Sequence, residues 1–137
     1  MYKTVISLLV ALHLGATFWH GDAHRQLAVG LPIAKTIFVY VVILIAPIVA
    51  AVLTWTRYFS AGLWLFFISM LGALLFGVYH HYVLVSPDNI GHLPDGPLSA
   101  HSQFVSSAAV IAMLELIGSL YGAFSLGSRY SQGSGRA

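Results

Sequence analysis

The sequence predicts an all-α, polytopic membrane protein in which four transmembrane helices form a bundle. Two features of the composition indicate this class: 58% of the 137 residues are hydrophobic and only 7% are charged. A soluble domain carries about a quarter charged residues because its surface faces water. The third observation is the presence of four apolar runs, each close to or longer than the roughly 20 residues that a helix needs to cross a bilayer. These runs comprise residues 4–22, 33–56, 60–84 and 102–126.

Each element follows from its own run. The first resembles a signal peptide at its start, but it continues to full length, so we expect a helix over 4–22. The second contains Pro47, which we expect to kink the helix because proline removes a backbone hydrogen bond. An extracytoplasmic loop at 85–101 joins the third and fourth runs. Together the spans form one domain (1–126), and the Gly/Ser-rich residues 127–137 predict a flexible cytoplasmic tail.

The positive charges predict the orientation. Four spans place both termini on one side of the membrane, together with the turn between the second and third spans. That side carries Lys3, Arg57, Arg129 and Arg136 and no acidic residue, whereas the other side carries Arg25, Lys35, Asp22, Asp88 and Asp95. Because cytoplasmic loops are enriched in Lys and Arg, we expect both termini in the cytoplasm. A prokaryotic cytoplasmic membrane is the expected location.

The histidines concentrate at the extracytoplasmic face. Six of the seven belong to this group: His20, His24, His80, His81, His92 and His101. A single histidine at this depth is explained by hydrogen bonds to water or lipid. These six histidines, however, come from three separate segments of the chain, which favours a shared site. His20 and His24 are four residues apart, the spacing by which one helix can chelate a metal ion. We expect the face of the fourth span that carries Glu115 to point into the bundle. The same face includes His101, which lies two heptads earlier in the sequence.

These observations predict a transition-metal site. Neutral imidazole, with carboxylates, is a common ligand of copper, zinc and iron, and nitrogen and oxygen sites rank Cu(II) highest among divalent ions. We therefore expect copper first, then zinc or iron. The expected ligands are His20, His24, His80, His81 and His101, with His92, Asp22 and Asp88 as secondary candidates. The alternative cofactor is haem b, held by His20 and either His80 or His81 on a neighbouring helix.

Two ionisable residues lie inside the predicted spans. Counted from the outer face, His13 and Glu115 lie at depths of roughly 15 and 20 Å for a rise of 1.5 Å per residue. Their side chains could therefore meet. Because an ionisable residue within a span is costly, the pair suggests a proton relay toward the outer site. The alternative is a protonated Glu115 that is hydrogen-bonded to a serine or tyrosine.

Other functions are excluded or left open. The chain has no cysteine, which excludes thiolate ligands, and it lacks the basic stripe of a nucleic-acid-binding protein. No hydrolase, P-loop, dinucleotide or HExxH motif is present, which argues against those enzyme classes. The choice between enzyme and binding protein stays open, with catalysis by the chain alone the less favoured alternative. Three functions remain: a metal-handling or redox subunit, a haem b electron-transfer subunit, and a structural subunit whose histidines line an interface. The expected partners are the lipid bilayer and either other membrane subunits or further copies of this chain.

Overall fold

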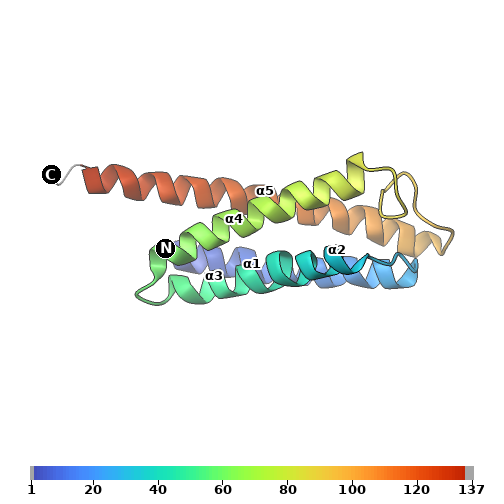
Figure 1. Cartoon of the computed structure of the whole chain (residues 1–137), viewed down its shortest axis with the longest axis horizontal. Helices are drawn as coiled ribbons and strands as arrows, with labels where there is room; N and C mark the ends of the chain where they lie inside the picture. Colours follow the sequence, from blue (N-terminus) through green and yellow to red (C-terminus); the bar gives the residue numbers. More distant parts are fainter. Residues whose placement is uncertain (1, 135–137) are drawn as a thin grey trace.

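The computed structural model describes residues 2–134, with side chains described through residue 129. Every regular element in this part of the chain is a helix (Figure 1). In chain order the elements are α1 (Tyr2–Gln26), α2 (Ile33–Phe38), η1 (Val39–Ile45), α3 (Ala46–Thr54), α4 (Phe59–Val78), η2 (Tyr79–Val83) and α5 (Leu98–Ser134). The elements η1 and η2 are π-helical, so their turns are wider than those of the α-helices that they continue.

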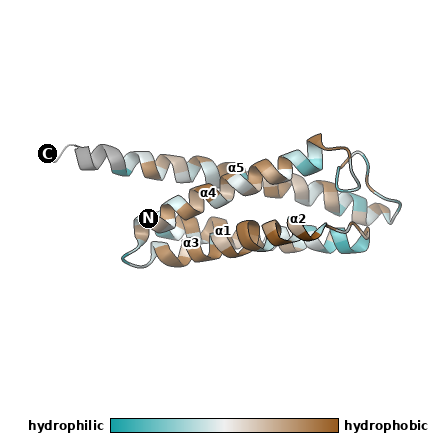
Figure 2. Ribbon diagram, viewed as in Figure 1, coloured by the Kyte–Doolittle hydropathy of each residue, from teal (hydrophilic) through white to brown (hydrophobic). Residues whose placement is uncertain are grey.

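Four stretches are long and apolar enough to cross a membrane, which confirms the number of predicted spans. They are Tyr2–Gln26, Ile33–Thr54, Phe59–Val83 and Leu98–Arg129. The second stretch, called the second span below, consists of α2, η1 and α3. Figure 2 shows hydrophobic residues along most of each helix and hydrophilic residues gathered toward one end.

The four spans run in alternating directions, as Figure 1 shows. Helix α5 packs against α1 and α4, and α3 packs against α4 and α1. The connections at 27–32 and 84–97 lie at one end of the molecule, called the loop end. The start of α1 and the turn at 55–58 lie at the opposite end, called the terminal end.

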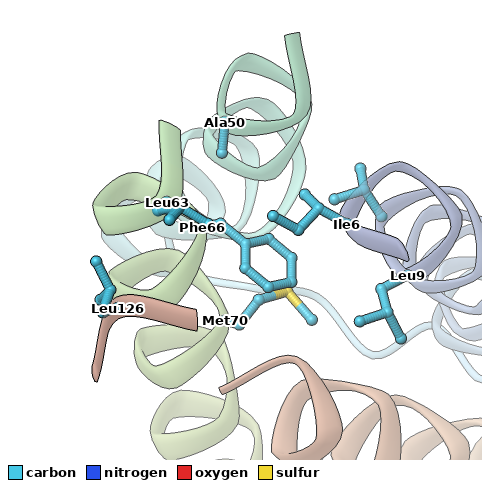
Figure 3. Packing of buried hydrophobic residues seen from close by; sticks show 8 residues of the cluster. Ile6, Leu9, Ala50, Leu63, Phe66, Met70 and Leu126 are labelled. Atoms are coloured by element: carbon cyan, nitrogen blue, oxygen red, sulfur yellow. The ribbon is translucent and has the colours of Figure 1, made fainter. Parts of the chain in front are cut away.

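The main hydrophobic core lies toward the terminal end, where α1, α3, α4 and α5 meet. Its buried residues are Ile6, Leu9, Val10, Ala50, Leu63, Phe66, Met70 and Leu126 (Figure 3). Gly62 permits this packing, because a Cβ atom there would lie 2.8 Å from the backbone nitrogen of Thr54. A smaller cluster at the loop end contains Ala23, Leu27, Val29, Ala100 and Phe104. The candidate site lies directly beside this second cluster, against Phe104.

Three expectations about the elements need correction. Residues 127–134 continue α5 instead of starting a tail at 127. Within this segment Arg129 donates a hydrogen bond to Ser60 Oγ (2.9 Å) and lies over the Phe59 ring. Residues 135–137 of the expected tail lie outside the described residues. Helix α5 starts at Leu98, so the outer loop is 84–97 rather than 85–101. The sequence predicted a kink at Pro47 but not the π-helical segment η1, which ends two residues before it.

Candidate metal centre

Three histidines from two spans converge near the loop end. Helix α1 supplies His20 and His24, and η2 supplies His81. One ring nitrogen from each can be chosen so that all three lie within 4.8 Å of one another. The His20 ring meets the other two edge-on, with centroid distances of 4.7 Å to His24 and 4.8 Å to His81. Phe104 of α5 contacts all three rings and forms an apolar wall behind these residues, called the histidine trio below.

Hydrogen bonds to backbone carbonyls fix the protonation of two members of the trio. The Nδ1 atom of His24 lies 3.2 Å from the carbonyl oxygen of Val29, and the Nδ1 atom of His81 lies 2.9 Å from that of Asp88. A carbonyl oxygen only accepts, so in both rings Nδ1 carries the proton. A neutral imidazole has one N–H, which leaves the Nε2 lone pair of each ring free.

A serine hydroxyl fixes the third ring in the same way. His20 Nδ1 lies 2.8 Å from Ser107 Oγ. The Ser107 hydroxyl donates its own proton to the carbonyl of Gln103 (2.6 Å) or Phe104 (3.1 Å). The serine oxygen therefore accepts from His20 Nδ1–H, and the Nε2 lone pair of His20 is also free.

In these tautomers the Nε2 lone pairs of His20 and His24 face each other, and one ring nitrogen of His81 lies within 4.8 Å of a ring nitrogen of each. The Nε2 atoms of His20 and His24 are only 3.1 Å apart, and in the neutral Nδ1–H tautomers neither atom carries a proton to donate to the other. Two facing lone pairs repel each other unless a cation lies between them. A separation of this size fits two ligands of one ion at about 2.0–2.1 Å from each, the usual zinc–nitrogen bond length. The arrangement of the trio therefore suits a metal ion.

A carboxylate lies beside the trio. Asp88 Oδ1 lies 3.2 Å from His24 Nε2 and 3.3 Å from His81 Nδ1, yet it accepts no hydrogen bond among the described residues. Burial has the largest single effect and raises the pKa of the Asp88 carboxyl, but the rings of His81, His24 and His20 together lower it, so the pKa falls below its ordinary value. The group is therefore an anion, and with the trio it offers three neutral nitrogens and one charged oxygen.

The π-helical turn η2 decides which of the two adjacent histidines reaches the site. The backbone N–H of Leu84 donates to the carbonyl of Tyr79 across five residues (2.7 Å), and Ile90 N–H donates to His81 O (3.0 Å). The outer loop is thereby folded back against His81. The His80 ring turns away, because its Nδ1–H donates to the carbonyl of Phe76 (2.8 Å) and its ring packs on that phenyl group.

Four other expected ligands are not brought to the trio. His80 is held by Phe76, and His101 donates through Nε2 to the carbonyl of Pro94 (2.8 Å). His101 also lies six residues before Ser107, so it stands roughly 9 Å nearer the loop end than the helix position that touches His20. The remaining two bond elsewhere: His92 to Asn89, and Asp22 to Arg25, Gln26 and Gln103.

The buried pair expected inside the spans does meet. His13 Nε2 lies 3.1 Å from Glu115 Oε1, and the two residues are 0% and 1% exposed. The hydroxyl of Ser119 donates to the main-chain carbonyl of Glu115 and not to its carboxyl group. Gly77 leaves space on the other side, since a Cβ atom there would lie 3.6 Å from Glu115 Oε2 and 3.9 Å from His81 Cδ2. Only a gap of about one methyl group therefore separates the carboxyl group from the trio.

The sequence did not reveal the residues that orient the trio. Ser107 belongs to no recognisable motif. The only feature of the sequence that could have indicated it is that it precedes Ala108, which lies one heptad after His101 on the inward face of the fourth span. In the sequence Phe104 is indistinguishable from any other buried aromatic residue. Val29 contributes its backbone carbonyl, which does not depend on the identity of the side chain. Such partners become visible only when the helices are packed.

Comparisons with known proteins do not assign this arrangement to a family. The chain matches no protein-family model, and neither the curated proteins nor the solved structures contain a match.

Proposed function

We propose that this chain is a four-helix-bundle membrane protein that binds one transition-metal ion through His20, His24 and His81, with Asp88 as the fourth ligand. The single observation that carries the proposal is the convergence of one ring nitrogen from each of the three histidines to within 4.8 Å of one another. Each ring donates its Nδ1–H to a fixed acceptor and leaves its Nε2 lone pair free for the ion. Bonds of this kind orient the ligands in known metal sites and increase their basicity.

The donor set favours copper. Three imidazoles and a carboxylate form a nitrogen and oxygen site without thiolate, for which Cu(II) has the highest affinity among the first-row divalent ions. Zinc also accepts such ligands in a tetrahedral arrangement, and iron follows. A resident ion of this kind would serve metal handling or electron transfer within a larger membrane complex.

A bare ion accounts for the site better than haem b does. A porphyrin lies between its two axial ligands, whereas His20 and His81 are in edge contact with a centroid distance of 4.8 Å. The other haem ligand suggested by the sequence, His80, is turned toward Phe76. A purely structural role at a partner interface is also less favoured, because His20 is only 7% exposed in the isolated chain.

The charge distribution supports an extracytoplasmic position for the ion. The terminal end carries Lys3, Arg57 and Arg129 without an acidic residue among the described positions. The positive-inside rule therefore places this end in the cytoplasm and the trio at the opposite face. An ion at that face is accessible to partners outside the cytoplasm.

Metal analysis of the purified protein tests the proposal. Wild type is loaded in detergent with Cu(II), Zn(II) or Fe(II) in turn, dialysed, and analysed for metal per chain. We expect about one ion per chain for the preferred metal, and loss of that ion from the variant His20→Ala/His81→Ala. The matched control is His80→Ala/His101→Ala, which removes two histidines outside the trio and should retain the ion.

Each outcome has a definite meaning. A wild type that retains none of the three metals would overturn the proposal, as would equal loss of metal from the control variant. A Soret absorption band in protein purified from the membrane would replace the bare ion with haem. The control removes the same number of imidazoles. If the metal were bound non-specifically by surface histidines, the metal content per chain would therefore fall equally in both variants.

A further inference from the structure

A cavity of about 600 Å³ lies beside the histidine trio, between α1, the second span and α4. Its volume falls within the range of roughly 300–1,000 Å³ that is typical of small-molecule sites. One wall is polar and contains His20, His24, His81, Asp88 and Glu115. The facing wall is apolar and includes Val39, Ile43, Leu44, Ala73 and Phe76. The two walls together fit a molecule with one polar part and one apolar part.

The cavity extends from the trio toward the middle of the membrane. Ala73 lies eight residues before His81 on the same span, a distance of roughly 12 Å along the helix. Glu115 lies eight residues beyond Ser107, which contacts His20, and so reaches a similar depth. The polar groups are therefore concentrated at the loop end and along one side, while the inner part is mostly apolar.

A residue that lines this space has a buried oxygen without a partner. Glu115 lines the cavity and is 1% exposed, and its Oε2 atom has no hydrogen-bond partner among the described residues. A buried polar atom without a partner is costly, by about 1–3 kcal/mol in typical cases. A hydroxyl or N–H group on a bound molecule would supply the missing donor, and Gly77 leaves the passage from this oxygen to His81 open.

The second span provides the route of access. Only 17% of its most apolar window is buried, against 33% for each of the other three spans. Its residues Ile37, Val41 and Ile45, which do not line the cavity, are each more than half exposed, so this span contacts the rest of the chain less than the others do. The cavity behind it is partly open. An opening between this span and its neighbours would admit a molecule from the bilayer without a passage through water.

We propose that the cavity binds a membrane-soluble amphiphile beside the metal ion. The polar head ligates the ion and donates a hydrogen bond to Glu115, and the apolar body lies along Leu44, Ile43 and Phe76. This inference rests on the proposed metal site, because the ion provides one of the two contacts to the head group. It identifies a class of ligand, lipid-soluble molecules with a single metal-ligating head, for a site otherwise defined only by its metal.

Two hydroxamic acids test the proposal on the Cu(II)-loaded protein in detergent. Acetohydroxamic acid carries the metal-ligating head alone, whereas octanohydroxamic acid adds an alkyl chain. Binding is followed by the change in the Cu(II) electron paramagnetic resonance spectrum. We expect the longer acid to bind wild type at least about tenfold more tightly, since one buried methylene contributes about 0.8 kcal/mol.

Variants on the second span separate the cavity from partitioning into the micelle. Leu44→Trp fills the apolar wall, and we expect it to reduce the ratio of the two affinities toward one while the affinity for the short acid stays unchanged. Val41→Trp places the same indole on a residue that is 51% exposed and does not line the cavity, so it should keep the ratio of wild type. If Leu44→Trp does not retain one copper per chain, Val39→Trp fills the same wall instead.

The outcomes distinguish this inference from the function on which it rests. A wild type that binds no copper overturns the metal site and this inference with it. A copper-loaded protein whose affinity ratio is the same in the cavity-filling variant and in wild type overturns the amphiphile site alone. Equal loss of the ratio in Val41→Trp would do the same, because the effect would then not come from the cavity.

Discussion

Removal of the Ser107 hydroxyl should weaken metal binding although Ser107 does not touch the ion. The residue is 0% exposed, and its oxygen accepts the Nδ1–H of His20 at 2.8 Å. In the variant Ser107→Ala the ring loses the acceptor that keeps the proton on Nδ1. The proton can then move to Nε2, where it occupies the lone pair that faces the ion.

The magnitude follows from the role of a partner behind a ligand. Loss of such a partner commonly lowers metal affinity about 10- to 100-fold. This corresponds to about 1.4–2.7 kcal/mol of binding free energy. A similar figure, about 1–3 kcal/mol, applies to a buried donor that is left without an acceptor. We therefore expect the dissociation constant of the Ser107→Ala variant to rise by one to two orders of magnitude.

A competition titration against a chromophoric chelator measures this change, and Ser69→Ala is the matched control. Ser69 is 2% exposed and its hydroxyl donates to the carbonyl three residues earlier (3.1 Å), as that of Ser107 can, but it contacts no imidazole. We expect Ser69→Ala to keep wild-type affinity and Ser107→Thr, which retains the hydroxyl, to restore most of it. Wild-type affinity in Ser107→Ala would refute the assignment of the tautomer, and an equal loss in Ser69→Ala would point to general loosening of the helices.

Two further predictions concern packing and orientation. Gly62→Ala should destabilise the fold by about 1–3 kcal/mol, because the new methyl group would lie 2.8 Å from the backbone nitrogen of Thr54. The control Gly15→Ala, whose methyl group would meet no atom within 4 Å, should not lower the midpoint of thermal unfolding followed by circular dichroism. Equal midpoints for the two variants would contradict the packing argument. Because the chain has no cysteine, a single introduced cysteine is the only site that a maleimide can label. A membrane-impermeant maleimide applied to intact cells should label Gly91→Cys, but it should label Thr56→Cys only after lysis. The reverse pattern would invert the proposed topology.

The spans could be predicted closely because transfer into a bilayer depends on contiguous residues. Each of the four apolar runs became a helical span whose ends differ from the prediction by at most four residues, except that α5 continues eight residues further, to Ser134. The 127–134 segment could not be predicted in this way. Its composition is typical of a flexible chain, yet α5 continues through it, and Arg129 is held there by Ser60 and Phe59, which belong to a distant part of the sequence.

The candidate site was predictable in its location but not in its membership. Spacing by four residues was enough to place His20 and His24 on one face of α1, since both belong to a single regular helix. No spacing rule separates His81 from His80, because the π-helical turn η2 changes the rotation of the chain at this point. The conformation of the outer loop likewise decides that Asp88, and not His92, lies beside the trio.

By itself, the sequence determined the membrane class, the four spans and the end of the molecule where the histidines gather. These properties depend on the local sum of transfer free energies and on the order of residues along each helix. Only the tertiary structure decided which rings converge, which acceptors face their Nδ1 atoms and that His13 meets Glu115 across a sequence separation of 102 residues. Those outcomes depend on the relative depth and rotation of neighbouring helices, which are set by packing contacts such as that of Gly62 against α3.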